Sequence, residues 1–278
     1  MCGICGFTGY RQDQKTVIER MMKAIEHRGP DSEGSFCREK ITLGFRRLSI
    51  IDLEDGQQPM ESADGNLHIV FNGEIYDYKE LRAELEAFGI SFCTHSDTEV
   101  LVNTIQQYGE KALDKLRGMF GFAVWNEKEQ TLMLARDFFG IKPVYYAEID
   151  GHFVFASEIK SILAFPGYER KVNQKALEQY LSFQYAPLEE TFFKGIYKLM
   201  PGHMLLYKNG NYEIKTYFKT KLTPGKWNRK TNMDQLRSQL AEILKDSVKH
   251  HMLSDVEVGA FLSGGVDSGY LGAASGAD

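Results

Sequence analysis

The sequence predicts an α+β fold of two antiparallel sheets with helices outside them, followed by the beginning of a second unit. Strand-like segments dominate the first ~215 residues, and the helical segments come in blocks rather than alternating singly with strands. Asn209-Gly210 between two strand-like runs is a strong hairpin signal. Residues 219–230 form a basic, polar linker, and a long helical pattern follows it. We therefore expect one domain over residues 1–218 and the start of another over 231–278.

Composition limits the classes of partner and compartment. The chain has 278 residues, of which 43% are hydrophobic and 26% are charged. This composition is typical of soluble globular proteins. Its net charge of −5 gives no reason to expect nucleic acid or an anionic membrane as a partner. The sequence shows no membrane span and no signal peptide. The 4 cysteines fit neither a disulfide framework nor a zinc site, so we expect a cytoplasmic protein with reduced thiols and no metal site.

The elements of the first domain follow from periodicity and turn signals. Apolar residues at helical spacing predict helices, and short apolar runs bounded by Gly, Asn or Asp predict strands. The His27–Asp31 segment is a turn by composition, and its Arg and His either hold that turn against the core, which we favour, or contact a ligand. The predicted strands are 4–10, 41–45, 48–51, 67–72 (stopping at Gly73), 121–125, 131–136, 144–147, 152–156, 203–207 and 212–217; the predicted helices are 16–26, 79–88, 97–108 (capped by Ser96 or Asp97), 112–116, 158–164 and 173–183.

The second unit opens with a helix over 233–251, a strand over 256–262 and then Ser-Gly-Gly-Val-Asp-Ser at 263–268. Two glycines bring backbone N–H groups close to an anion, and the positive end of the next helix favours phosphate. Asp267 would repel phosphate unless it holds a hydrogen-bond donor or a metal ion such as Mg²⁺. The usual Gly-Lys-Ser/Thr of an NTPase loop is absent, and a plain strand-to-helix turn is the alternative reading.

Met1-Cys2-Gly3-Ile4 begins the chain. Because methionine before a small residue is normally trimmed, we expect the mature protein to begin at Cys2. That residue would then carry both a thiol, which is a nucleophile, and an α-amino group, which is a base. The alternative is that Cys2 is an ordinary small residue next to the translation start.

Three further positions match parts of an amide-hydrolysing site. Asn72 beside Gly73 offers a side-chain amide and a backbone N–H as two donors to an oxyanion, although a plain Asn-Gly turn has the same composition. Arg47 can pair with a substrate carboxylate, and Asp97 either caps a helix or receives an ammonium group. Together these residues provide a nucleophile, an oxyanion hole and one charge for each end of an amino acid.

Several motifs occur together in this sequence: Cys2–Ile4, His27–Asp31, Arg47–Ile50, Asn72–Tyr76, Ser96–Glu99, Arg136–Pro143, Ala156–Lys160 and Ser263–Ser268. In combination, they make the sequence resemble the glutaminase half of the class II glutamine amidotransferases, and residues 263–268 narrow the resemblance to glutamine-hydrolysing asparagine synthetases. The resemblance implies an N-terminal-nucleophile hydrolase fold, a four-layer αββα sandwich, followed by an α/β ATP-pyrophosphatase domain.

The resemblance also implies roles for individual residues. Glutamine would be hydrolysed by the Cys2 thiol, and ATP with Mg²⁺ would activate aspartate for amidation to asparagine. The implied roles are Cys2 as nucleophile; Asn72 and Gly73 as oxyanion donors; Arg47 for the glutamine carboxylate and Asp97 for its ammonium group; Glu74 and the backbone of Leu48, Ser49, Ile50 and Ile51 as pocket lining; and Leu262, Ser263, Gly264, Gly265, Val266, Asp267 and Ser268 for the ATP phosphates.

The resemblance does not extend to a whole synthetase. Members of that family are much longer, and Gly269 and Gly272 are poor residues for the helix expected after the ATP motif. We expect glutaminase competence without complete asparagine synthesis from this chain alone. Either the chain is a fragment or a partner chain supplies the rest, and a homodimer also remains open. The rival functions are the glutaminase part of another class II amidotransferase and a non-catalytic module that senses glutamine or a nucleotide.

Overall fold

The computed structural model describes residues 1–52, 55–221 and 232–276. These residues fall into two compact units, Met1–Lys219 and Thr220–Asp278, and each is described by itself. Most of the predicted linker lies outside the described residues. Within them, every helix is too short or too polar to cross a membrane.

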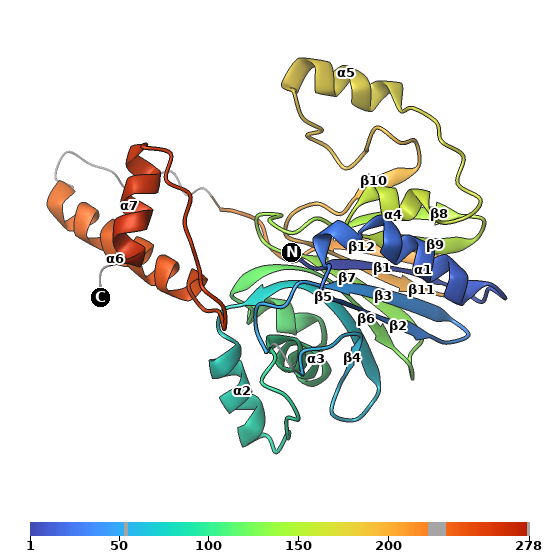
Figure 1. The fold of residues 1–278 in the computed structure, drawn as a ribbon, viewed down its shortest axis with the longest axis horizontal. Coiled ribbons are helices and arrows are strands. Elements are labelled where there is room, and N and C mark those ends of the chain that lie inside the picture. Colours follow the sequence, from blue (N-terminus) through green and yellow to red (C-terminus); the bar gives the residue numbers. More distant parts are fainter. Residues whose placement is uncertain (53–54, 222–231, 277–278) are drawn as a thin grey trace. The chain divides into compact units, whose positions relative to one another are not determined.

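Two six-stranded sheets form the first unit (Figure 1), and every pairing within them is antiparallel. Sheet A has the order β10-β8-β9-β1-β3-β2, and sheet B has the order β12-β11-β7-β6-β5-β4. The strands of sheet A are β1 (Gly3–Thr8), β2 (Ser32–Cys37), β3 (Ile41–Arg47), β8 (Tyr145–Ile149), β9 (His152–Ala156) and β10 (Ile196–Lys198). Those of sheet B are β4 (Met60–Glu61), β5 (Leu67–Ile75), β6 (Gly118–Asn126), β7 (Thr131–Arg136), β11 (His203–Lys208) and β12 (Asn211–Thr216).

Helices cover the outer face of each sheet. Helices α1 (Gln14–Ala24) and α4 (Ile159–Leu163) pack on sheet A, while α2 (Tyr78–Ala87) and α3 (Asp97–Tyr108) pack on sheet B. Helix α5 (Gln174–Phe183) extends away from the sheets in Figure 1. Short 3-10 helices occur at η1 (Glu26–Arg28) and η2 (Gly109–Asp114).

Alternation along each strand divides the buried side chains among three cores. On β9, Phe153 and Phe155 lie between the two sheets, whereas Val154 and Ala156 face helices α1 and α4. On β5, Val70 lies between the sheets, and its neighbours Ile69 and Phe71 face the helices of sheet B. This period of two is the ordinary geometry of a strand buried on both faces. The layers are therefore helix, sheet, sheet and helix, which confirms the predicted αββα sandwich.

Some strand predictions were wrong near the edges of sheet A and in sheet B. Residues 48–51 form a loop, and β3 continues through Arg47 because β2 pairs with it to the end. The β2 sequence, Ser-Glu-Gly-Ser-Phe-Cys, lacks an apolar run because β2 is an edge strand. The strand predicted to stop at Gly73 continues to Ile75, since β6 pairs with all of it.

The second unit contains α6 (Met233–His251), as predicted, and α7 (Val266–Ser275). The Asn232 side chain caps α6 by accepting hydrogen bonds from two backbone N–H groups in its first turn. The predicted strand over 256–262 was wrong, because this segment is irregular and exposed. A strand needs a ladder partner, and the described part of this unit contains no other strand.

Candidate active site

Cys2 lies at one end of the sandwich, immediately before β1 and beside the end of β3. Strand β1 is an interior strand of sheet A, paired on both sides, so the residue before it has a well-defined position. Cys2 Sγ lies 3.4 Å from both the backbone nitrogen and the carbonyl oxygen of Leu48. The thiol is half-buried there, against the loop that follows β3.

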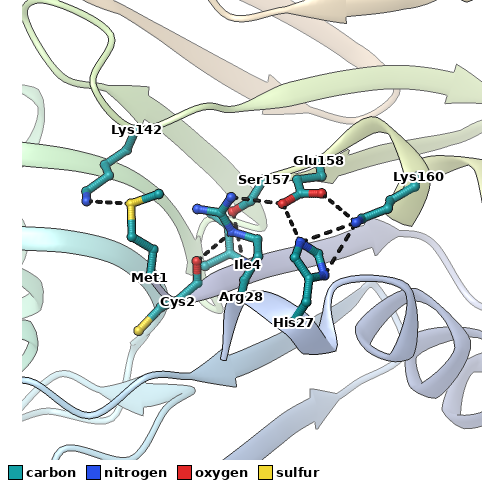
Figure 2. Close-up of polar contacts among 9 residues, drawn as sticks. All are labelled: Met1, Cys2, Ile4, His27, Arg28, Lys142, Ser157, Glu158 and Lys160. Carbon is teal, nitrogen blue, oxygen red and sulfur yellow. Dashed lines mark hydrogen bonds and ion pairs between the residues drawn. The ribbon is translucent and has the colours of Figure 1, made fainter. Parts of the chain in front are cut away.

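Burial raises the pKa of the Cys2 thiol, while a hydrogen bond from the Leu48 backbone and the nearby α-amino group act in the opposite direction. That amino group belongs to Met1 in the structure, and burial lowers its pKa. The Met1 side chain extends to Lys142, whose Nζ lies 3.2 Å from Met1 Sδ (Figure 2). The amino group beside the thiol is thus that of Met1, whereas the sequence predicts the α-amino group of Cys2 itself once Met1 is removed.

The backbone carbonyl of Cys2 is held by two side chains. Arg28 Nε donates to it at 2.9 Å (Figure 2). The hydrogen-bond partners of the Asn72 amide set its orientation. In that orientation, Asn72 Nδ2 donates to the same oxygen at 3.0 Å, and Oδ1 accepts from Arg28 Nη2 at 3.3 Å. Asn72 is 1% exposed and lies on β5 of sheet B, so this contact joins the two sheets next to the thiol.

The Glu158 carboxylate contacts three cationic or potentially cationic side chains, those of Arg28, His27 and Lys160 (Figure 2). Its Oε1 accepts from Arg28 Nη1 and contacts His27 Nε2, both at 2.9 Å, and Oε2 lies 3.1 Å from Lys160 Nζ. Burial alone would raise the pKa of this carboxyl, but the hydrogen bonds from Arg28, Lys160 and His27 outweigh it and lower the pKa to about 2. Glu158 is therefore an anion at any working pH.

Asp97 is the first residue of α3, and the predicted cap before it is confirmed, since Ser96 Oγ accepts from Thr98 N at 3.1 Å. The Asp97 carboxylate also reaches the end of β5. Its Oδ2 accepts from Ile75 N at 3.0 Å, and the residue is 5% exposed. Burial, reinforced by the negative charge of Glu74, raises the pKa of Asp97 to about 7. An ammonium ligand would restore the charged form of this carboxyl.

Arg47 ends β3 and is 6% exposed. Its Nη2 donates to the carbonyl oxygens of Ile51 (3.5 Å) and Asp52, so the guanidinium lies under the 48–52 loop. The charges of Asp97 and Arg47 both act on the Cys2 thiol, the first raising its pKa and the second lowering it. The predicted nucleophile, cation and anion are therefore brought into one neighbourhood.

Lys142 is a buried lysine that the sequence interpretation gave no role. Burial lowers its pKa, while the charges of Glu74 and Cys2 act in the opposite direction, so both lie near it. The Asp137 carboxylate fixes the loop that carries it, accepting from the backbone nitrogens of Phe139, Ile141 and Lys142 at 2.8–3.1 Å. This loop accounts for the Arg136–Pro143 motif in structural terms.

Sequence reasoning also missed the contacts of Arg28 and Glu158. It favoured a structural role for the 27–31 turn and gave the Ala156–Lys160 motif no role. The structure joins the two segments beside Cys2, although 130 residues separate Arg28 from Glu158 along the chain. The signal was the motif itself, which places an acidic residue two positions after an interior strand.

The second predicted site lies in the other unit. Gly264 has φ +77° and Gly265 caps α7, as a loop that turns backbone N–H groups toward an anion requires. Ser263 Oγ and Ser268 Oγ lie 3.0 Å apart. Leu262 and Val266 are exposed on either side. Within the described residues, no group of three or more His, Cys, Asp or Glu side chains could hold a metal ion, and Asp267 belongs to no such group.

Comparison with known protein families shows to which family the chain belongs. The glutamine amidotransferase domain model matches residues 1–218. The chain belongs to the glutamine amidotransferase family. The asparagine synthase model matches residues 239–277, which lie within the second unit of this amidotransferase.

Relatives of the amidotransferase are named as asparagine synthetases. Glutamine-hydrolyzing asparagine synthetase 1 of Bacillus subtilis is 46% identical over an alignment of 277 positions, which covers 96% of this chain and 43% of the relative. Putative asparagine synthetase 2 of Methanocaldococcus jannaschii is 36% identical, with coverage of 96% and 55%. The chain thus spans about half the length of such relatives.

Solved structures agree on the fold. The allosteric regulatory enzyme of purine biosynthesis superposes with a TM-score of 0.62 at 18% identity, covering 99% of this chain and 63% of that one. A glutamine phosphoribosylpyrophosphate amidotransferase from B. subtilis gives 0.59, also at 18% identity, with coverage of 99% and 64%. At this identity the likeness is one of fold, and it confirms the N-terminal-nucleophile hydrolase architecture.

Proposed function

We propose that the first unit hydrolyses glutamine to glutamate and ammonia, with Cys2 as the nucleophile. The observation that carries the proposal is the environment of Cys2. The backbone carbonyl of Cys2 is held by Arg28 and Asn72, and the opposite charges of Arg47 and Asp97 act on the Cys2 thiol. These charges suit the carboxylate and the ammonium group of one amino acid.

In the proposed mechanism, the Cys2 α-amino group, exposed once Met1 is removed, accepts the thiol proton. Sγ attacks the side-chain amide carbon of glutamine, and the carbonyl electrons move onto oxygen. The Asn72 amide and the Gly73 N–H donate to that oxyanion. The amide nitrogen takes the proton and leaves as ammonia, which gives a thioester. Water then attacks the thioester and releases glutamate and the thiol.

Glutamine is held at its α-carbon end in the same proposal. Arg47 pairs with its α-carboxylate and Asp97 with its α-ammonium group. Glu74 lines the pocket together with the backbone of the loop of residues 48–51. Its negative charge acts on both Asp97 and Lys142, in the direction that raises the pKa of each. The pocket is therefore specific for a free amino acid, not for an amide within a peptide.

For the whole protein, we propose ATP-dependent amidation of aspartate to asparagine in the cytoplasm. The match of residues 239–277 to asparagine synthase and the names of the relatives support it. The start of α7, with Gly264, Gly265 and the two serine hydroxyls, fits the phosphate end of ATP. ATP with Mg²⁺ would activate the aspartate carboxyl, and the ammonia would displace AMP.

The direct test is glutamate release from glutamine by this chain, with and without prior treatment by iodoacetamide. We expect turnover that alkylation abolishes, in a protein that mass spectrometry shows to begin at Cys2. Glutamate release that is insensitive to alkylation, or an active protein that retains Met1, would contradict the mechanism. Ammonia measured alongside glutamate should appear in equal amount.

The raised pKa of Asp97 predicts a pH dependence. Its carboxyl has a pKa of about 7 in the folded protein and an ordinary value of 3.8, so its contribution to folding stability is lost as pH rises between them. An ammonium group needs the carboxylate, so kcat/KM for glutamine should fall about tenfold per unit below pH 7. Asp97→Asn should raise KM and remove this inflection from the profile. An inflection unchanged in Asp97→Asn would assign the titration to another group.

A further inference from the structure

We propose that Glu158 is a positioning residue for the nucleophile, because it fixes the Arg28 guanidinium and Arg28 fixes the backbone carbonyl of Cys2. The inference deepens the proposed glutaminase function and rests on it. Glu158 does not touch the thiol itself. It acts through one intermediate side chain, and Figure 2 shows Arg28 bonded to Glu158 on one side and to the Cys2 carbonyl on the other.

The backbone places Glu158 at a fixed distance from Cys2. Strand β9 pairs with β1 in the register Ala156 opposite Cys5. Directly after β9, Ser157 N donates to Ile4 O at 2.8 Å, and Ile4 N donates to Ser157 Oγ at 3.0 Å. Glu158 thus follows a residue bonded twice to the strand that begins next to the nucleophile. Movement between the two backbones is limited by these bonds.

Arg28 uses three nitrogens on three different partners. Nη1 donates to Glu158 Oε1 at 2.9 Å, Nε to Cys2 O at 2.9 Å and Nη2 to Asn72 Oδ1 at 3.3 Å. A guanidinium is planar and rigid, so fixing one of its nitrogens sets the direction of the other two. The Asn72 amide, which also donates to Cys2 O, is oriented by the same group. Loss of the Glu158 contact therefore affects both donors to that carbonyl.

His27 and Lys160 hold the other side of Glu158. Lys160 Nζ lies 3.1 Å from Oε2 and 3.2 Å from His27 Nε2, which itself contacts Oε1. The carboxylate is thereby restrained from both sides. With its pKa lowered to about 2, it also stays ionised. A charged acceptor gives shorter and stronger hydrogen bonds than a neutral one, so the anchor depends on the negative charge.

If Glu158 only stabilised the fold, its replacement would lower the free energy of unfolding slightly and would leave kcat unchanged. Its side chain is 25% exposed, and ion pairs that reach solvent contribute little to folding. A variant without the charge should therefore fold. Misplacement of a reacting group by about 1 Å, by contrast, can reduce a rate by about 10²-fold. Stability and turnover are expected to separate.

The first experiment compares Glu158→Gln with Glu84→Gln in the glutaminase assay. Glu84 is a matched control, a surface carboxylate on α2 bonded to Lys115 Nζ at 2.7 Å and to Tyr108. We expect kcat to fall about tenfold to a hundredfold in Glu158→Gln with KM changed less than about threefold, and neither to change in Glu84→Gln. Glu158→Asp, which keeps the charge, should recover part of kcat. Equal kcat in the two glutamine variants, or a loss confined to KM, would overturn the proposal.

The second experiment tests whether Glu158 acts through Arg28. In a double-mutant cycle with Arg28→Met, removing the charge of Glu158 should have almost no further effect on kcat, because the intermediate is already gone. Additive losses would mean that Glu158 acts by another route, and they would overturn the proposal.

The third measurement does not need glutaminase activity. The rate of Cys2 alkylation by iodoacetamide, followed by mass spectrometry, should rise several-fold in Glu158→Gln relative to Glu84→Gln, since the thiol leaves its place against Leu48. Equal alkylation rates would contradict positioning by Glu158. Absence of glutamate release from the unmodified protein would contradict the proposed function instead, so the two failures are distinguishable.

Discussion

Replacement of Cys2 by alanine is expected to lower glutamate release from glutamine by about 10⁴-fold or more, because no other group can form the thioester. The thiol lies at 3.4 Å from the Leu48 backbone, where a methyl group is accommodated without a change of fold. Glutamine binding by Arg47 and Asp97 should survive. Calorimetry should therefore detect glutamine bound to Cys2→Ala with an affinity within a fewfold of the KM of the unmodified protein.

Cys93→Ala is the matched control for this prediction. Cys93 is an exposed free thiol before α3, and its backbone nitrogen donates to Glu99. Its alanine variant should keep full turnover, and it should remain sensitive to iodoacetamide. Turnover that persists in Cys2→Ala but is lost in Cys93→Ala would move the nucleophile to the other thiol.

Replacement of Asn72 by alanine is expected to lower kcat by about 10²–10³-fold, the usual cost of one oxyanion donor. Two losses combine here. The amide no longer faces the oxyanion, and Cys2 O loses one of its two donors. Asn72→Asp, which keeps the shape but has no N–H, should be as slow as alanine. Stopped assays over a range of glutamine concentrations separate kcat from KM.

Asn66→Ala is the control for Asn72→Ala. Asn66 directly precedes β5, and its Oδ1 accepts a hydrogen bond from Lys128 N in a turn. This variant should be active. If Asn72→Ala changed KM alone, the amide would bind the substrate in its ground state and would not stabilise the oxyanion.

Local signals predicted most elements of this fold. The hairpin of β11 and β12 has the turn that Asn209-Gly210 indicates, and α6 has the predicted bounds. Strand prediction failed where a pairing partner determines whether a segment forms a strand. Strand β2 forms because β3 pairs with it, and residues 256–262 lack a strand because no ladder partner lies among the described residues of their unit.

The same division holds for the candidate site. Cys2, Asn72 and Asp97 could each be singled out by residue type and local pattern, and the structure gathers them. The contact between Arg28 and Glu158 could not, since no local pattern relates a 3-10 turn to a residue 130 positions later. Even the burial that raises the pKa of Asp97 depends on β5 and α3 packing together.

The division of β1 between two cores bears on how accurately the nucleophile is aimed. Ile4 and Gly6 face sheet B, whereas Cys5 and Phe7 face the helices, and a Cβ atom at Gly6 would lie 2.5 Å from the Phe155 ring. Sliding β1 by one residue would exchange these faces and drive a side chain into that ring. The strand is therefore held in one register. Core side chains outside the proposed glutamine pocket thus fix the position of the Cys2 sulfur along the strand direction.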